Sequence, residues 1–189
     1  MNKILSTILV ATVISAGALA IPASNVMDNT VQVGGSAMFP MKTIVENAVN
    51  SKDHTTLVAA VKAAGLVDTL ASKGPFTVFA PVNSAFSELP AGTVETLLKP
   101  ENKDMLAKIL TYHVVAGRLD FKAIRSLIQA GNGKAELKTV AGGILVATMN
   151  GPRNIEITDE KGGVANISTY DVYQSNGVIH VIDHVLIPN

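Results

Sequence analysis

Residues Gly74–Phe86, GPFTVFAPVNSAF, carry the clearest structural signal in the chain. Residues 76–80 combine strong β-formers with alternating apolar positions, which predicts a strand sandwiched between a sheet and helices. Pro81 is expected to end this strand. The Asn83 side chain is expected to accept hydrogen bonds from the first-turn amides of the helix it begins, so that Phe86 folds back onto the core. The stretch therefore predicts a strand, a turn and a short helix in the middle of a mixed domain.

The segments around this unit are mostly helical. Apolar residues recur at helical spacing in residues 57–64, and Pro100 opens a longer helix with apolar residues from Met105 to Leu110 on one face. Asp53, Thr93 and Asp120 stand where N-caps are expected, each just before such a pattern.

After Gly131 the period of the pattern changes from helical to two. Residues 136–149 and 154–168 are each predicted to form a hairpin, with turns at 141–143 and 159–163. Helices followed by an antiparallel run define an α+β domain.

The stretch Asn176–Pro188, NGVIHVIDHVLIP, predicts the last strand. Side chains alternate between the two faces of a strand, and here most of those on both faces are apolar. This strand is therefore expected to lie in the centre of a sheet. A third notable segment is Tyr112-His113, which follows the apolar helix residues Ile109 and Leu110.

Three segments together resemble the fasciclin (FAS1) domain family. Gly74–Phe86 is similar to its first signature block, Tyr112-His113 to its Tyr-His segment after an apolar helix, and Asn176–Pro188 to its second block. The resemblance covers about residues 42–188, although Val82 stands where many members have Thr. It implies an α+β fold, a wedge of antiparallel and mixed β-sheets with several short helices packed on one side.

The resemblance also implies an extracellular adhesion or interaction module rather than an enzyme. In animal members, residues around the Tyr-His pair and a nearby Asp-Ile pair are tied to integrin binding, and here the latter reads Asp104-Met105. A purely structural interpretation of this helix places Met105 and Leu106 in the core and Asp104 in solvent. The candidate partner-binding or family-motif residues are Tyr112, His113, Asp104, Met105, Asn83, His180 and Asp183.

Met1–Ala20 has the pattern of a cleavable signal peptide. Lys3 precedes a nearly continuous apolar run that closes on Ala18-Leu19-Ala20, so cleavage is expected after Ala20. The alternative is a retained anchor, but the run is slightly shorter than the ~20 residues of a membrane span. Residues 21–41 are interpreted as a flexible tether and 42–189 as the fasciclin domain, located in the periplasm or secreted.

Composition narrows the function classes. The chain contains no cysteine, which excludes disulfides, a thiol nucleophile and a lipidated cysteine. Without Lys3 its formal net charge is −1, so there is no general attraction to nucleic acid or anionic lipid. Neither nucleic acid nor stable membrane insertion after cleavage is expected.

The histidines do not suggest a metal site or cofactor. On a strand, His180 and His184 would lie ~13 Å apart, too far to share one ion. His113 and His180 are instead expected to be partly buried and hydrogen-bonded to backbone or to neighbours such as Asn83 or Asp183. His184 is expected at the surface.

Catalytic patterns are weak. There is no Gly-x-Ser-x-Gly sequence, and Ser84, His113 and Asp183 would form a triad only if the fold brought them together. The sequence therefore predicts a non-enzymatic module that binds a protein or glycan at a cell surface. The alternative is a periplasmic small-molecule carrier or enzyme, in which Tyr112, His113 and His180 converge on one pocket.

Overall fold

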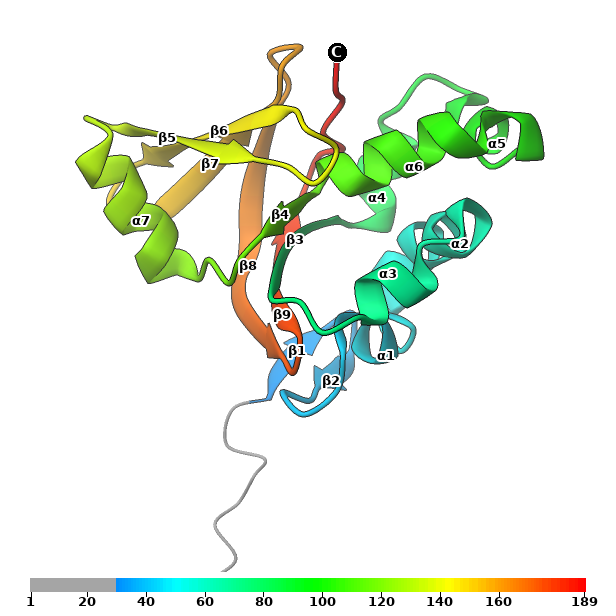
Figure 1. Cartoon of the computed structure of the whole chain (residues 1–189), viewed down its shortest axis with the longest axis horizontal. Coiled ribbons are helices and arrows are strands. Elements are labelled where there is room, and N and C mark those ends of the chain that lie inside the picture. Colours follow the sequence, from blue (N-terminus) through cyan, green and yellow to red (C-terminus); the bar gives the residue numbers. More distant parts are fainter. Residues whose placement is uncertain (1–29) are drawn as a thin grey trace, which may run out of the picture.

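Figure 1 shows the computed structural model of the chain, which describes residues 30–189. The helices are α1 Ile44–Ala48, α2 Thr55–Ala64, α3 Val67–Ala71, α4 Asn83–Ser87, α5 Thr93–Leu97, α6 Lys103–Tyr112 and α7 Phe121–Ala130, with 3-10 turns at Lys52–His54 and Pro100–Asn102. The strands are β1 Val31–Val33, β2 Ser36–Met38, β3 Phe76–Pro81, β4 Val114–Ala116, β5 Lys134–Lys138, β6 Ile144–Asn150, β7 Asn154–Thr158, β8 Val164–Gln174 and β9 Gly177–Ile182.

Strands β3–β9 form one seven-stranded sheet in the order β4-β3-β9-β8-β7-β6-β5. The pair β3–β9 is parallel and places Phe79 beside His180, whereas the other pairs in this sheet are antiparallel. The two signature blocks, about a hundred residues apart in the chain, are thus neighbouring central strands. The predicted α+β fold with a mixed sheet and several short helices is confirmed.

Two apolar cores lie on opposite sides of β3 and β9. Because side chains alternate along a strand, Val78 and Ala80 face the first core and Phe79 faces the second. Helices α1, α2, α3 and α6 cover the first core, while α7 packs with β5–β8 around the second (Figure 1). This burial on both faces explains why β3 and β9 consist almost entirely of apolar residues.

The predicted tether at residues 21–41 is wrong for the part that the structure describes. Strands β1 and β2 form an antiparallel hairpin around Gly34-Gly35, whose φ angles of 57° and 74° suit the positive-φ positions of a two-residue turn. Val33 and Met38 point into the first core and are buried. Three-residue strands are too short to show a period, which is why this hairpin resembled a polar linker. Residues 1–29, including the predicted signal peptide, lie outside the described residues.

The predicted caps have mixed outcomes. Asp120 caps α7 as expected, since its Oδ1 accepts from Ala123 N at 2.8 Å. Asn83 does not cap its own helix. Its Oδ1 instead accepts from Thr56 N at 3.0 Å, in the first turn of α2, and its Nδ2 donates to Lys52 O at 2.8 Å. Asp53 and Thr93 make no capping hydrogen bond, because α2 begins after His54 and α5 begins at Thr93 itself, after Gly92.

The buried side-chain amide of Asn176 connects helices α1 and α3 to the sheet. Asn176, in the turn between β8 and β9, accepts from Ile44 N at 3.0 Å. Its Nδ2 donates to Leu70 O and Ser72 O, both at 2.8 Å. The second signature block therefore fixes the start of α1 and the end of α3, and this contact orients the helical layer on the sheet.

Within residues 30–189, none of the helices combines the length and apolar character that a bilayer-crossing segment requires.

Candidate functional site

Tyr112 lies at the end of α6, completely buried in the second core. Its hydroxyl donates to Ile144 O at 2.9 Å and accepts from Glu160 N at 3.0 Å. Burial raises the pKa of the phenol to about 12, and the hydrogen bond from Glu160 partly opposes this shift. Tyr112 therefore links α6 to the turns of both hairpins and presents no surface to a partner.

His113 follows Tyr112 directly and is also buried. Its Nδ1 lies 2.8 Å from Ile109 O, and its Nε2 accepts from Leu186 N at 3.0 Å. These partners require the neutral tautomer with the proton on Nδ1. Burial lowers the pKa of His113 to about 4, and the carbonyl of Ile109 partly opposes the decrease.

His180 is enclosed in the same way on β9. Its Nε2 lies 2.8 Å from Leu119 O, and its ring stacks on Phe79 with centroids 5.7 Å apart. Burial lowers its pKa. The expected backbone partners of His113 and His180 are confirmed, but the suggested partners Asn83 and Asp183 are wrong.

The remaining polar candidates are occupied elsewhere. The Asp183 carboxylate accepts from Asn166 N at 2.7 Å and from Asn166 Nδ2 at 3.0 Å. His184 lies near the surface and pairs with Glu88 at 3.1 Å. These contacts hold the end of β9 and the segment after it against neighbouring elements.

Within residues 30–189, the structure supports neither the Ser84, His113 and Asp183 triad nor a metal site. Both ring nitrogens of His113 have backbone partners, so neither is free to activate Ser84. Across residues 30–189, no three His, Cys, Asp or Glu side chains are grouped so that they could hold a metal ion. Tyr112 belongs to the second core and His180 stacks on Phe79 of that core, whereas His113 lines a cavity in the first core. The predicted convergence of the three on one pocket is therefore wrong.

Asp104 and Met105 are both exposed on the first turns of α6, where Met105 has 58% of its surface accessible. The expected burial of Met105 is wrong, because Leu106 and Leu110 supply the core face of this helix instead. Among the motif candidates, Asp104, Met105 and Asp183 are exposed, and the Asp183 carboxylate is already paired with Asn166.

A second reachable surface is the outer face of β5–β8, which the alternation of these strands indicated only indirectly. Inward residues such as Leu145 and Ile157 pack with α7, and the intervening residues point away from it. Val146, Thr158 and Val164 are opposite one another in the register. The resulting outer sheet face carries these residues together with Lys134, Glu136, Lys138, Ile144, Thr148, Glu156 and Asn166.

This arrangement is that of a fasciclin domain: a mixed sheet with two signature strands paired in parallel and a buried Tyr-His pair. The sequence matches the fasciclin domain family over residues 52–188, and the chain belongs to this family.

Known proteins agree with this assignment. Protein sll1483 of Synechocystis sp. is 50% identical over 148 residues, which cover 77% of this chain and 73% of that protein. The cell surface glycolipoprotein MPB83 of Mycobacterium bovis is 35% identical over 161 residues, covering 82% of this chain and 64% of MPB83. The FAS1 domain pair of the insect cell adhesion molecule Fasciclin I has the same fold, with a TM-score of 0.70 at 19% identity over 79% of this chain and 52% of that one.

Proposed function

We propose that this protein is an exported interaction module that binds a protein or a glycan at a cell surface or in the periplasm. The observation that carries the proposal is the enclosure of Tyr112, His113 and His180, which directs attention to the exterior of the domain as the contact surface. The family relationship to a cell surface glycolipoprotein and the apolar leader pattern of residues 4–20 support a location outside the cytoplasm.

The outer sheet face is the favoured contact surface. Ile144 and Val164 are 41% and 45% exposed there, although neither contributes to a core. Lysines and glutamates surround them on β5 and β7, which gives an apolar centre with a charged rim. This combination is typical of protein interfaces. The second candidate surface is the Asp104-Met105 pair on α6.

The proposal is tested by capture from envelope and host surface fractions. The bait is tagged protein, expressed as the full chain and recovered in its exported form, and captured species are identified and then purified for rebinding. We expect the double variant Ile144→Ser, Val164→Ser to lose binding, while Met105→Ser, which removes a more exposed apolar side chain, retains it. The opposite pattern would move the interface to α6, and absence of any rebinding partner would contradict the proposed function.

The mass of the recovered protein tests its export separately. Cleavage after Ala20 predicts a chain that begins at Ile21. A recovered chain that still contains Met1–Ala20 and stays with the membrane would show a retained anchor instead.

A further inference from the structure

The first core contains a partly open cavity of about 230 Å³ between the sheet and helices α1, α2 and α3. Its walls are apolar side chains from separate elements, among them Met38, Ile44, Leu57, Leu70 and Ile179. A cavity of about 150 Å³ with such a lining stays dry and holds one benzene molecule. The cavity is therefore large enough for a substituted six-membered ring or a short branched chain.

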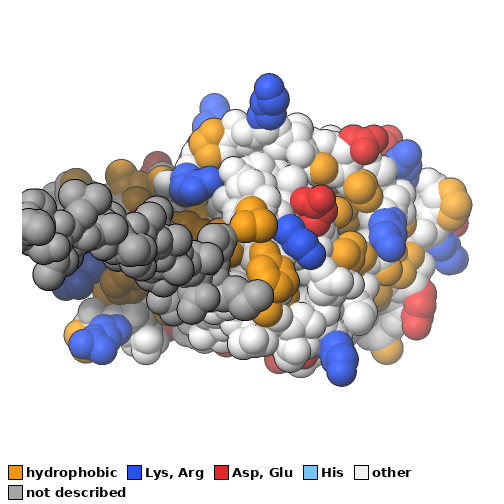
Figure 2. All heavy atoms as spheres, turned by 90° about the horizontal axis from the view of Figure 1, so that it is seen from below, with side chains coloured by type: hydrophobic (Ala, Val, Ile, Leu, Met, Phe, Trp, Pro, Cys, Tyr) orange, Lys and Arg blue, Asp and Glu red, His pale blue; other side chains and the backbone are white. Residues whose placement is uncertain are grey.

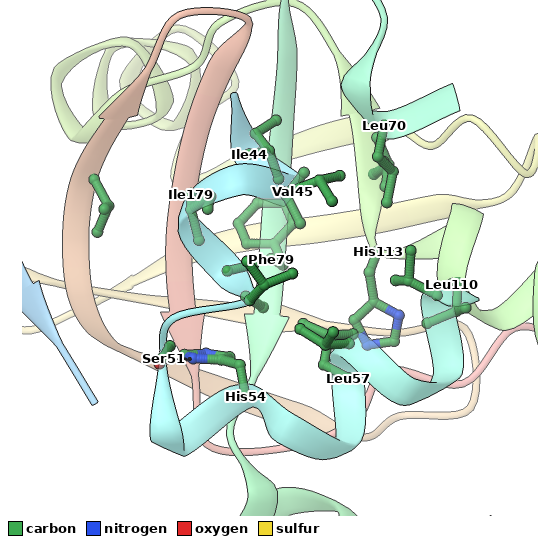
Figure 3. Close-up of a pocket in the computed structure, with 18 of the residues that line it drawn as sticks. Ile44, Val45, Ser51, His54, Leu57, Leu70, Phe79, Leu110, His113 and Ile179 are labelled. Atoms are coloured by element: carbon green, nitrogen blue, oxygen red, sulfur yellow. Dashed lines mark hydrogen bonds between the residues drawn. The ribbon is translucent and has the colours of Figure 1, made fainter. Parts of the chain in front are cut away.

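Few polar side chains reach this cavity, and one of them is unsatisfied. His113 uses both of its ring nitrogens for backbone contacts. His54 is only 3% exposed, and its Nδ1 lies 2.8 Å from Ser51 Oγ, but its Nε2 has no hydrogen-bond partner. Figure 3 shows His54 and Ser51 together on one side of the cavity and His113 on the other, beside Leu110.

The protonation of His54 defines what it can bind. Burial lowers the pKa of its ring, and the nearby carbonyl of Ala80 and the charge of Asp53 only partly oppose this decrease, so the ring is neutral at pH 7. If Nδ1 accepts from Ser51, then Nε2 carries the proton and donates. If Nδ1 donates to Ser51, then Nε2 accepts. A hydroxyl group can pair with Nε2 in either tautomer, because it both donates and accepts.

The cavity also has a route to solvent. Val49 lines it and is 48% exposed, and Val45, Val58 and Val67 line it and are partly exposed. Lys62 stands exposed on α2 at the same margin. Figure 2 views the end of the molecule where β1, β2 and α1 lie, and exposed hydrophobic side chains are visible there among charged ones.

We propose that this cavity binds a small apolar molecule that carries one hydroxyl group, with the apolar part among the core side chains and the hydroxyl on His54 Nε2. A wholly apolar molecule would fill the space but leave Nε2 unpaired, and a charged one would lose its hydration in an apolar site. The site is separate from the outer sheet face, so its occupancy does not depend on the proposed surface function.

Two probes of similar shape test the proposal: 4-ethylphenol, which has the hydroxyl, and ethylbenzene, which lacks it. Binding is measured by amide chemical shifts of the ¹⁵N-labelled protein, with the ring nitrogens of His54 observed directly. We expect 4-ethylphenol to bind about five- to tenfold more tightly, the effect of one added hydrogen bond in a buried site. The shifts should concentrate at cavity residues such as Leu57 and Ile179 and include His54 Nε2.

Two variants separate the hydrogen bond from the space. His54→Leu should bind both probes with similar affinity, whereas Val58→Trp, at the margin of the cavity, should weaken both without disturbing the core. Equal affinity of the two probes for the wild-type protein would overturn the proposal, as would absence of binding up to their solubility limits. Shifts confined to the protein exterior, or unchanged hydroxyl preference in a folded His54→Leu variant, would overturn it as well.

Discussion

Acid should destabilise this protein through His113, and the structure gives the size of the effect. The folded state lowers the pKa of His113 from 6.5 to about 4, because protonation would place a charge in the core and remove the acceptor for Leu186 N. Between these two values the unfolded chain binds a proton that the folded protein does not. The contribution of His113 to the free energy of unfolding is therefore fully present above pH 6.5. It decreases as the pH falls below 6.5 and is lost below about pH 4.

The magnitude follows from the difference of the two pKa values. Each unit corresponds to about 1.4 kcal/mol, so the full loss from His113 is about 3 kcal/mol, of which about 2 kcal/mol falls between pH 7 and pH 4.5. Burial also lowers the pKa values of His54 and His180, so the wild-type protein should lose more than this amount in total.

The assay is urea unfolding at pH 7.0, 6.0, 5.0 and 4.5 for the wild-type protein and His113→Gln. The amide of glutamine retains one donor and one acceptor but does not titrate. We expect the variant to be less stable at pH 7, and to lose about 2 kcal/mol less than the wild type on going to pH 4.5. Parallel pH profiles for the two proteins would refute the placement of His113 as a buried neutral ring.

Three substitutions test other contacts of the fold by urea unfolding. Asn176→Ala removes three hydrogen bonds and should cost about 3 kcal/mol, against well under 1 kcal/mol for the exposed control Asn50→Ala; equal effects would show that Asn176 does not join the helical layer to the sheet. Tyr112→Phe removes a hydroxyl with two backbone partners and should cost about 1–2 kcal/mol with no change of fold, so a neutral effect would argue against the linkage to the hairpin turns. Asp120→Ala should cost about 1 kcal/mol and increase amide exchange in the first turn of α7, and unchanged exchange there would exclude a capping role.

The sequence predicted elements well wherever the pattern was local and strong. Residues 76–80 form a strand, residues after Gly131 form hairpins, and Asp120 caps a helix, because each depends on neighbours within a few positions. The central position of β9 was also predictable, since burial on both faces leaves an apolar sequence on both faces.

What the sequence could not provide was the identity of distant partners. Asn83 is a residue type that often caps its own helix. The fold brings the start of α2 beside it, and its side-chain oxygen accepts from the Thr56 amide there instead. The hairpin of β1 and β2 was missed because its strands are too short to show an alternating pattern. Val33 and Met38 are buried only because they pack against distant residues of the first core.

Partners that are distant in the sequence also explain why the candidate site was predicted incorrectly. Tyr112 and His113 stood out because their residue types suit binding and catalysis, yet their hydrogen bonds run to Ile144, Glu160, Ile109 and Leu186. Three of these partners lie more than thirty residues away, in segments whose approach depends on the whole sheet. His54, whose Nε2 is left unpaired in the cavity, has no local signal that distinguishes it from a surface histidine.

The central claim is that this fasciclin domain binds its partner through its exterior, whereas the buried Tyr112-His113 pair stabilises the fold. The most direct test is the affinity of a purified captured partner for the wild-type protein and for Tyr112→Phe at pH 7, with each shown to be folded. The account predicts that the two dissociation constants agree within about twofold, since the hydroxyl is completely enclosed. A loss of tenfold or more in a folded Tyr112→Phe protein would place the pair in the binding site and contradict the account.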